Sequence, residues 1–118
     1  MEERGIYMGS LSNTPRPPYY AVIFTSKRTP GDNGYAKTAA QMLELAEKQE
    51  GFLGTESVRE ESGFGMTVSY WASMESIERW KHNMPHQKAK ALGKKLWYEA
   101  YGIRICRVES DHFFDSPR

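Results

Sequence analysis

Apolar side chains alternate along four extended segments of this chain. The first segment, from Tyr19 to Lys27, is mostly apolar on both faces, and the turn-rich stretch 28–34 closes it. Residues 52–59 and 64–71 form two more such segments, and the short polar turn between them predicts an antiparallel hairpin. The fourth segment runs from Trp97 to Val108. The pattern therefore predicts four strands.

Two intervening regions change to the helical spacing of three and four residues. The first predicts a helix from Tyr35 to Lys48, which Gly51 stops. Ser73 is placed to cap the second helix, with a glutamate in its first turn. The segment 83–85 interrupts that helix, and Pro85 suits the start of a further helix that ends near Lys95.

The order of these elements predicts an α+β fold: a ferredoxin-like antiparallel sheet with helices on one face. Several strands are apolar on both faces, so the face without helices needs a cover. A second copy of the chain is the simplest cover, and we therefore expect a homodimer. The expected domain spans residues 19–109, after an extended arm (1–18) that is rich in proline and before a tail (110–118).

Composition excludes several classes of protein. The 118 residues fit one domain, and the near balance of 16 basic and 15 acidic residues argues against a nucleic-acid partner. We find no run of like charges and no apolar stretch near 18 residues, so we expect no membrane partner and a cytoplasmic location. Cys106 is the only cysteine, and we expect it to be a buried apolar filler on the last strand.

Three segments carry a resemblance to a known family. Residues 70–81 (YWASMESIERWK) resemble the strand-to-helix signature of the antibiotic biosynthesis monooxygenase (ABM) family. Residues 50–54 are similar to the family's entry into its second strand. Pro85-His86, Gly93, Trp97-Tyr98-Glu99 and the segment 103–108 are similar to one branch of the family. The resemblance runs from about Tyr19 to Glu109.

The resemblance implies a dimeric α/β barrel, in which two sheets face each other and the helices lie outside. Some members of the family oxidise polyketide-type aromatic compounds without metal or flavin, and others bind and cleave haem. It thus suggests a cofactor-independent monooxygenase that acts on a small aromatic or quinol-type compound. Because the fold hosts several activities, function has to be argued from individual residues.

His86 is the candidate catalytic base, because a neutral imidazole can accept a proton from a phenolic substrate near pH 7. The alternative is a polar residue at a helix end that orients the break in the helix. His82 lies four residues earlier, which is a metal-ligand spacing, but Pro85 breaks the helix between them and no third ligand is evident. We therefore expect no metal site.

Five further residues are candidate substrate contacts. Trp71, Trp80 and Trp97 could line a pocket for a planar aromatic ligand or simply fill the core. On the last strand, alternation places Tyr98 and Arg104 on one face and Tyr101 on the other. Arg104 could bind a substrate anion or pair with an acidic residue of a partner subunit.

Two rival functions remain open. Haem-degrading relatives use a helical histidine, an earlier tryptophan and an asparagine in the first strand. Trp80 matches the tryptophan, but the ligand position falls near Lys90 and the first strand has no asparagine. The other rival is a non-catalytic dimer that binds a small molecule.

Overall fold

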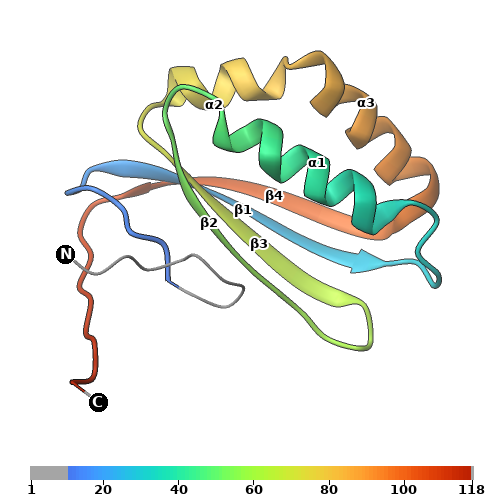
Figure 1. Cartoon of the computed structure of the whole chain (residues 1–118), viewed down its shortest axis with the longest axis horizontal. Helices are drawn as coiled ribbons and strands as arrows, with labels where there is room; N and C mark the ends of the chain where they lie inside the picture. Colours follow the sequence, from blue (N-terminus) through green and yellow to red (C-terminus); the bar gives the residue numbers. More distant parts are fainter. Residues whose placement is uncertain (1–10, 118) are drawn as a thin grey trace.

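A computed structural model describes residues 11–117. Its elements follow the order β1 (Tyr19–Arg28), α1 (Tyr35–Glu47), β2 (Phe52–Arg59), β3 (Phe64–Trp71), α2 (Met74–Lys81), α3 (Met84–Leu92), a π-helical turn (Gly93–Trp97) and β4 (Tyr98–Val108). The strands form one antiparallel sheet in the order β2-β3-β1-β4, and the helices lie together on one side of it (Figure 1). The predicted ferredoxin-like α+β fold is confirmed.

The strand register decides which side chains share a face. Trp71 at the end of β3 lies opposite both Tyr20 of β1 and Phe52 of β2. Its ring stacks on Trp80 of α2, so these positions belong to the helix-covered face. The alternate positions of each strand form the other side, which we call the open face: Tyr19, Ala21, Ile23, Thr25 and Lys27 of β1 with their neighbours on β3 and β4.

The predicted boundaries hold except near the last strand. The third helix ends at Leu92 instead of near Lys95, and β4 begins at Tyr98 instead of Trp97. Between them the chain makes a π-helical turn. This wider turn carries the Trp97 ring inward, where it is buried and its Nε1 donates a hydrogen bond to the Asn33 carbonyl at 2.9 Å.

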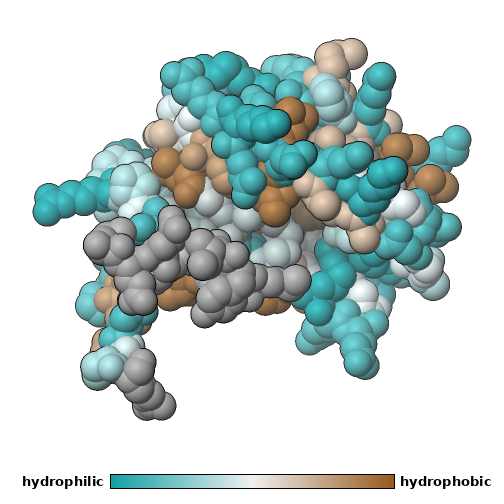
Figure 2. All heavy atoms as spheres, in the orientation of Figure 1, coloured by the Kyte–Doolittle hydropathy of each residue, from teal (hydrophilic) through white to brown (hydrophobic). Residues whose placement is uncertain are grey.

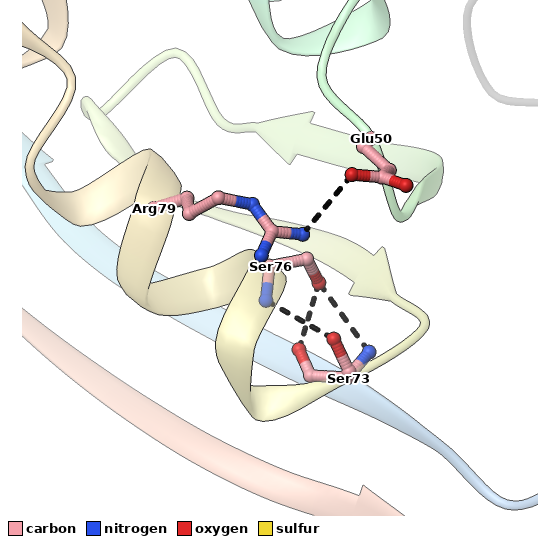
Figure 3. Close-up of polar contacts among 4 residues, drawn as sticks. All are labelled: Glu50, Ser73, Ser76 and Arg79. Carbon is pink, nitrogen blue, oxygen red and sulfur yellow. Dashed lines mark hydrogen bonds and ion pairs between the residues drawn. The ribbon is translucent and has the colours of Figure 1, made fainter.

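Polar contacts hold the start of α2 in place and join this helix to the loop between α1 and β2 (Figure 3). The Ser73 and Ser76 side chains each bond the other's backbone N–H, at 3.1 and 3.3 Å, and so form the predicted cap. Arg79 pairs with Glu50 at 3.7 Å. Gly51 lies beside this cap with φ +90°, and a Cβ there would approach the Ser76 Cβ to 2.5 Å. The close approach of the two loops therefore requires glycine at this position.

The helical layer leaves part of the sheet uncovered. Within residues 11–117 the buried apolar side chains are few: Tyr19, Ala21, Ala46, Trp71, Ile77 and Trp97. On the helix side of β4, Ile103 and Ile105 remain 50% and 43% exposed. On the open face, Phe64 and Met66 are 49% and 38% exposed. Figure 2 shows apolar atoms reaching the surface between polar side chains. The protomer therefore exposes apolar area on both faces of its sheet.

The chain itself covers one end of the open face. Residues 11–18 contain no helix or strand and include a cis Pro17–Pro18 peptide bond, while residues 1–10 of the expected arm lie outside the described part. Ser12 is buried, and its backbone N–H donates to Glu56, which also accepts from the Tyr70 hydroxyl at 2.7 Å. From the tail, Asp111 accepts from the Tyr19 hydroxyl at 2.6 Å. The segments before and after the sheet are thus hydrogen-bonded to it.

No helix in the described residues combines the length and the apolar character needed to cross a bilayer.

Candidate functional site

Four ring side chains form a continuous array at the β3–α2 corner, which we call the tryptophan cluster: Phe52, Trp71, Trp80 and His86. The Trp71 and Trp80 rings stack with centroids 6.1 Å apart, and Phe52 meets Trp71 edge-on at 5.3 Å. Trp71 is 1% exposed, and its Nε1 donates to the Ser69 hydroxyl at 2.9 Å. Trp71 is thus both core and the inner wall of the array.

His86 forms the outer end of this array. It lies in the first turn of α3, where the Asn83 side chain caps the helix by accepting from the His86 backbone N–H at 3.0 Å. The imidazole stacks nearly parallel on the Trp80 ring, with centroids 4.2 Å apart. Its Nδ1 lies 3.1 Å from the Trp80 carbonyl oxygen. A carbonyl can only accept, so Nδ1 carries the proton, and the neutral ring keeps a lone pair on Nε2.

The surroundings of His86 favour its neutral form. Burial of the ring lowers its pKa below the ordinary value. The hydrogen bond to the Trp80 carbonyl acts in the opposite direction, and the positive charge of Lys90, one turn further along α3, adds to the lowering. At neutral pH the side chain is therefore a half-buried, uncharged base in a fixed tautomer.

A second group of rings lies at the other end of β1, and we call it the tyrosine cluster: Phe24, Tyr35, Trp97, Tyr98 and Tyr101. Tyr35 meets Trp97 and Tyr98 edge-on at 5.8 and 5.9 Å. Burial raises the pKa of Tyr98, and its hydrogen bond with Tyr35 raises it further, while the charges of Arg59 and Arg28 oppose the rise. Trp97 and Tyr98 therefore contact Tyr35 and have no ring contact with the tryptophan cluster.

The predicted sharing of a face by Tyr98 and Arg104 is wrong. The register shifts at the start of β4: Arg28 lies opposite Tyr98, but Lys27 lies opposite Ala100, so Glu99 is an extra residue. Such a bulge reverses the alternation. Tyr98 therefore lies on the helix side with Tyr101, whose ring centroid is 5.9 Å away, and Arg104 lies on the open face opposite Ile23.

Arg104 helps to line a cavity of about 260 Å³ on the open face, together with Lys27 and Phe64. It forms no ion pair with another described residue. Cys106 is exposed, and the expectation that it is buried is wrong, because it lies on the face that the helices do not cover. The six sequence-predicted site residues thus fall into three places: His86, Trp71 and Trp80 together, Trp97 and Tyr98 together, and Arg104 alone.

His82 and His86 do not act together in this structure. His82 is exposed, and its Nε2 lies 3.6 Å from Glu78, while Nδ1 of His86 is used by the Trp80 carbonyl. Within residues 11–117, no group of three or more histidine, cysteine or acidic side chains is arranged to hold a metal ion.

Sequence reasoning missed three polar residues that contact the rings of these clusters or the backbone beside them. Asn83 is an N-cap, and its position three residues before His86 is the signal that could have revealed it. Arg28 stacks on Tyr35 at 3.7 Å, and Arg59 lies 5.9 Å from the same ring. Arg59 comes from β2 and Tyr35 from α1, and no pattern in the sequence predicts that they meet.

Comparison with known proteins gives a consistent result. The family model described as antibiotic biosynthesis monooxygenase matches residues 18–92. A Bacillus subtilis protein described as uncharacterized protein YqjZ is 52% identical over 107 residues, which cover 91% of this chain and 94% of that protein.

Solved structures show the same fold at low sequence identity. SnoaB from Streptomyces nogalater, described as a cofactor-independent oxygenase, is 10% identical with a TM-score of 0.66, and the match covers 86% of this chain and 100% of SnoaB. PA3566 from Pseudomonas aeruginosa is 13% identical with a TM-score of 0.66, covering 81% and 99% of the two chains.

Proposed function

Because the chain belongs to the antibiotic biosynthesis monooxygenase family, we propose that it is a monooxygenase that oxidises a small aromatic or quinol-type compound without a bound cofactor. The family match covers most of the ordered sheet and helices. The shared fold with SnoaB supports the reaction class, while the substrate has to be inferred from the site.

The geometry of His86 carries the proposal. Its Nδ1 donates to the Trp80 carbonyl, so Nε2 is the atom that accepts a proton from the substrate. Burial keeps the ring neutral and therefore ready to act as a base. The Trp80 ring stacked beside it, with Trp71 behind, makes the surroundings of this base apolar and aromatic, which suits an aromatic substrate.

The chemistry follows from this base. Deprotonation turns an activated CH₂ group, such as that of an anthrone, into a carbanion that transfers one electron to dioxygen. Superoxide and the substrate radical then combine into a carbon-bound peroxide. The peroxide loses water, so that one oxygen atom stays in the new carbonyl group and the other leaves as water. The apolar surroundings of the rings favour this step because they exclude competing solvent.

The remaining candidate residues have separate proposed roles. Trp97 and Tyr98 would contact a substrate only from the tyrosine cluster, at the far end of β1. Arg104 would reach a substrate only from the open face. We therefore assign the role of base to His86 and the apolar wall around it to Trp80 and Trp71, and keep the other three as candidate contacts for larger substrates.

Oxygen uptake with a panel of anthrones and hydroquinones tests the proposal. Turnover by the His86→Ala variant should be lower than that of the wild type by about 100-fold or more. His82→Ala is the matched control, because His82 is an exposed histidine on the neighbouring turn. Circular dichroism checks that both variants fold. Turnover that survives in His86→Ala removes His86 from the mechanism, and no uptake by the wild type with any compound favours a non-catalytic binding protein.

We also propose that the chain forms a homodimer through the open face. The support is the exposed apolar area on that face, which includes Phe64 and Met66. Light scattering should give twice the mass of the 13.6 kDa chain. Met66→Lys should shift the equilibrium toward the monomer, whereas Met84→Lys, an exposed methionine on α3, should not. A wild-type protein that stays monomeric at micromolar concentration contradicts the proposal.

A further inference from the structure

A cleft of about 650 Å³ opens beside the tyrosine cluster. Its walls are the end of β1 with the following loop (residues 27–32), the hairpin between β2 and β3 (residues 59–63) and Glu99. No residue of the tryptophan cluster, His86 included, lines this cleft. The cleft is therefore separate from the site proposed for oxidation.

Two arginine side chains form the cationic side of this cleft, and neutral groups hold both of them. Arg28 donates from Nε to the Trp97 carbonyl and from Nη2 to the Gly31 carbonyl, each at 3.0 Å. Arg59 donates from Nη1 to the Gly63 carbonyl at 2.6 Å and from Nη2 to the Ser26 hydroxyl at 2.8 Å. Both guanidinium carbons lie within 6 Å of the Tyr35 ring centroid, at 3.7 and 5.9 Å.

Neither guanidinium has an acidic partner among residues 11–117. Both side chains are partly buried, and charges in that position are normally paired. Lys27 adds a third cation to the wall and donates to the Ser62 carbonyl. The two arginines are thus fixed in place with their charges uncompensated.

Four carboxylates also line the cleft: Asp32, Glu60, Glu61 and Glu99. All four residues are exposed, and no carboxylate oxygen lies within 4.0 Å of the Arg28 or Arg59 guanidinium, although the backbone carbonyl of Asp32 lies 3.5 Å from Nη2 of Arg28. Both oxygens of Asp32 accept backbone N–H groups, from Gly34 and Ala36 at 3.1 Å. A rim of this sign repels long polyanions, but a small anion can pass it to reach the arginines.

We propose that this cleft binds one small anionic group, a carboxylate or a phosphate, between Arg28 and Arg59. Nη1 of Arg28 and Nε of Arg59 donate to no described residue, so each guanidinium keeps a donor for the ligand. Hydrogen bonds already hold both guanidinium groups in place, so these groups need no reordering when they bind an oxyanion.

NMR titration of the ¹⁵N-labelled full chain tests the proposal at constant ionic strength, with inorganic phosphate in one arm and benzoate in the other. We expect saturable shifts confined to residues 27–34 and 59–63. Tighter binding of benzoate indicates a ligand with an aromatic carboxylate, and tighter binding of phosphate indicates a phosphorylated ligand.

Two variants and one control decide the assignment. Arg59→Gln should weaken binding about tenfold or more, which corresponds to the loss of one charge-assisted hydrogen bond. Arg28→Lys keeps the positive charge but loses the planar guanidinium group and the hydrogen bonds that hold it, and should weaken binding as well. Arg79→Gln removes an exposed arginine that is paired with Glu50, and should leave binding unchanged. Equal affinity in Arg59→Gln and Arg79→Gln, no saturation in the wild type, or shifts spread over the whole chain overturns the proposal.

Discussion

The tryptophan cluster and the tyrosine cluster lie at opposite ends of β1 and hold their polar groups in opposite ways. In the first, His86 is stacked on Trp80 and bonded to its carbonyl, so the ring is kept neutral. In the second, Arg28 and Arg59 stay charged and are held by carbonyl and hydroxyl oxygens around Tyr35. Similar aromatic surroundings therefore hold a neutral side chain, our proposed proton acceptor, at one end and two charged side chains, our proposed anion site, at the other.

The difference follows from which side chain the rings surround. An imidazole can lose its charge when water is removed, and burial then lowers its pKa. A guanidinium cannot lose its proton in this way, so it needs hydrogen-bond acceptors or a counter-ion. The same kind of packing thus leaves His86 neutral and leaves the two arginines charged, held by neutral acceptors and without a counter-ion among the described residues.

The largest expected effect comes from removing the buried tryptophan of each cluster. Trp71 is 1% exposed and has ring neighbours on two sides, so Trp71→Ala should lower the free energy of unfolding by about 3–5 kcal/mol. Trp97 has one ring contact among the described residues, and Trp97→Ala should lie near the lower end of that range. Urea denaturation measures both. A larger loss in Trp97→Ala would show that the tyrosine cluster is the main core.

Two glycines beside the clusters separate steric clash from backbone strain. Gly51 and Gly34 have similar φ values of +90° and +84°, but only Gly51 has a neighbour, Ser76, where a Cβ would stand. We expect Gly34→Ala to cost about 1 kcal/mol from the backbone alone. Gly51→Ala should cost about 2–4 kcal/mol, because the clash is added. Thermal denaturation of the two variants gives the comparison, and equal costs would mean that the loop at Ser76 moves freely.

Removing the polar side chains that bind N–H groups at the starts of α2 and α1 should have smaller effects on stability. Ser73→Ala removes the capping bond to the Ser76 N–H and should cost about 1 kcal/mol. Asp32→Ala removes acceptors for two N–H groups at the exposed start of α1, and should cost about 0.5 kcal/mol. Urea midpoints of the two variants test this order. A larger loss in Asp32→Ala would contradict it.

The smallest expected effect is the pH dependence of stability from His86. Its pKa is lowered in the folded state, so between that value and its unfolded value the unfolded chain binds more protons. This contribution is therefore complete above the unfolded pKa and is lost as the pH falls toward the folded pKa. His86→Gln should flatten this part of the stability curve, whereas His82→Gln serves as the control. An unchanged slope in His86→Gln would show that its ring is more solvated than the stacking implies.

Sequence patterns predict the fold well because each element depends on local periodicity. The Ser73 cap, the hairpin and the break near Pro85 are set by neighbouring residues, and all three are confirmed. The site is less predictable, because its contacts join distant elements. Arg59 reaches Tyr35 only after β2 and α1 have packed, and the hydrogen bond from His86 to the Trp80 carbonyl depends on the turn between α2 and α3.

The wrong assignment of Tyr98 and Arg104 to one face of β4 has a simple cause. Strict alternation assigns Tyr98 and Arg104 to one side, but one extra residue at Glu99 reverses the assignment. The bulge has no clear signal in this sequence, since a single glutamate, although uncommon in strands, does not mark a bulge. The sequence therefore identified part of each cluster, namely His86, Trp71 and Trp80 of the first and Trp97 and Tyr98 of the second, but did not sort these residues into their two places.

The bulge at Glu99 also bears on how relatives are compared. The family match ends at residue 92, before β4 begins. A homologue that lacks Glu99 keeps a regular ladder with both flanking pairs, Arg28 with Tyr98 and Lys27 with Ala100, so its equivalents of Ile103 and Ile105 stay on the helix side. Counting residues from Tyr98 therefore assigns the faces of this strand differently in the two proteins, and transfer of roles along it needs a superposition of backbones.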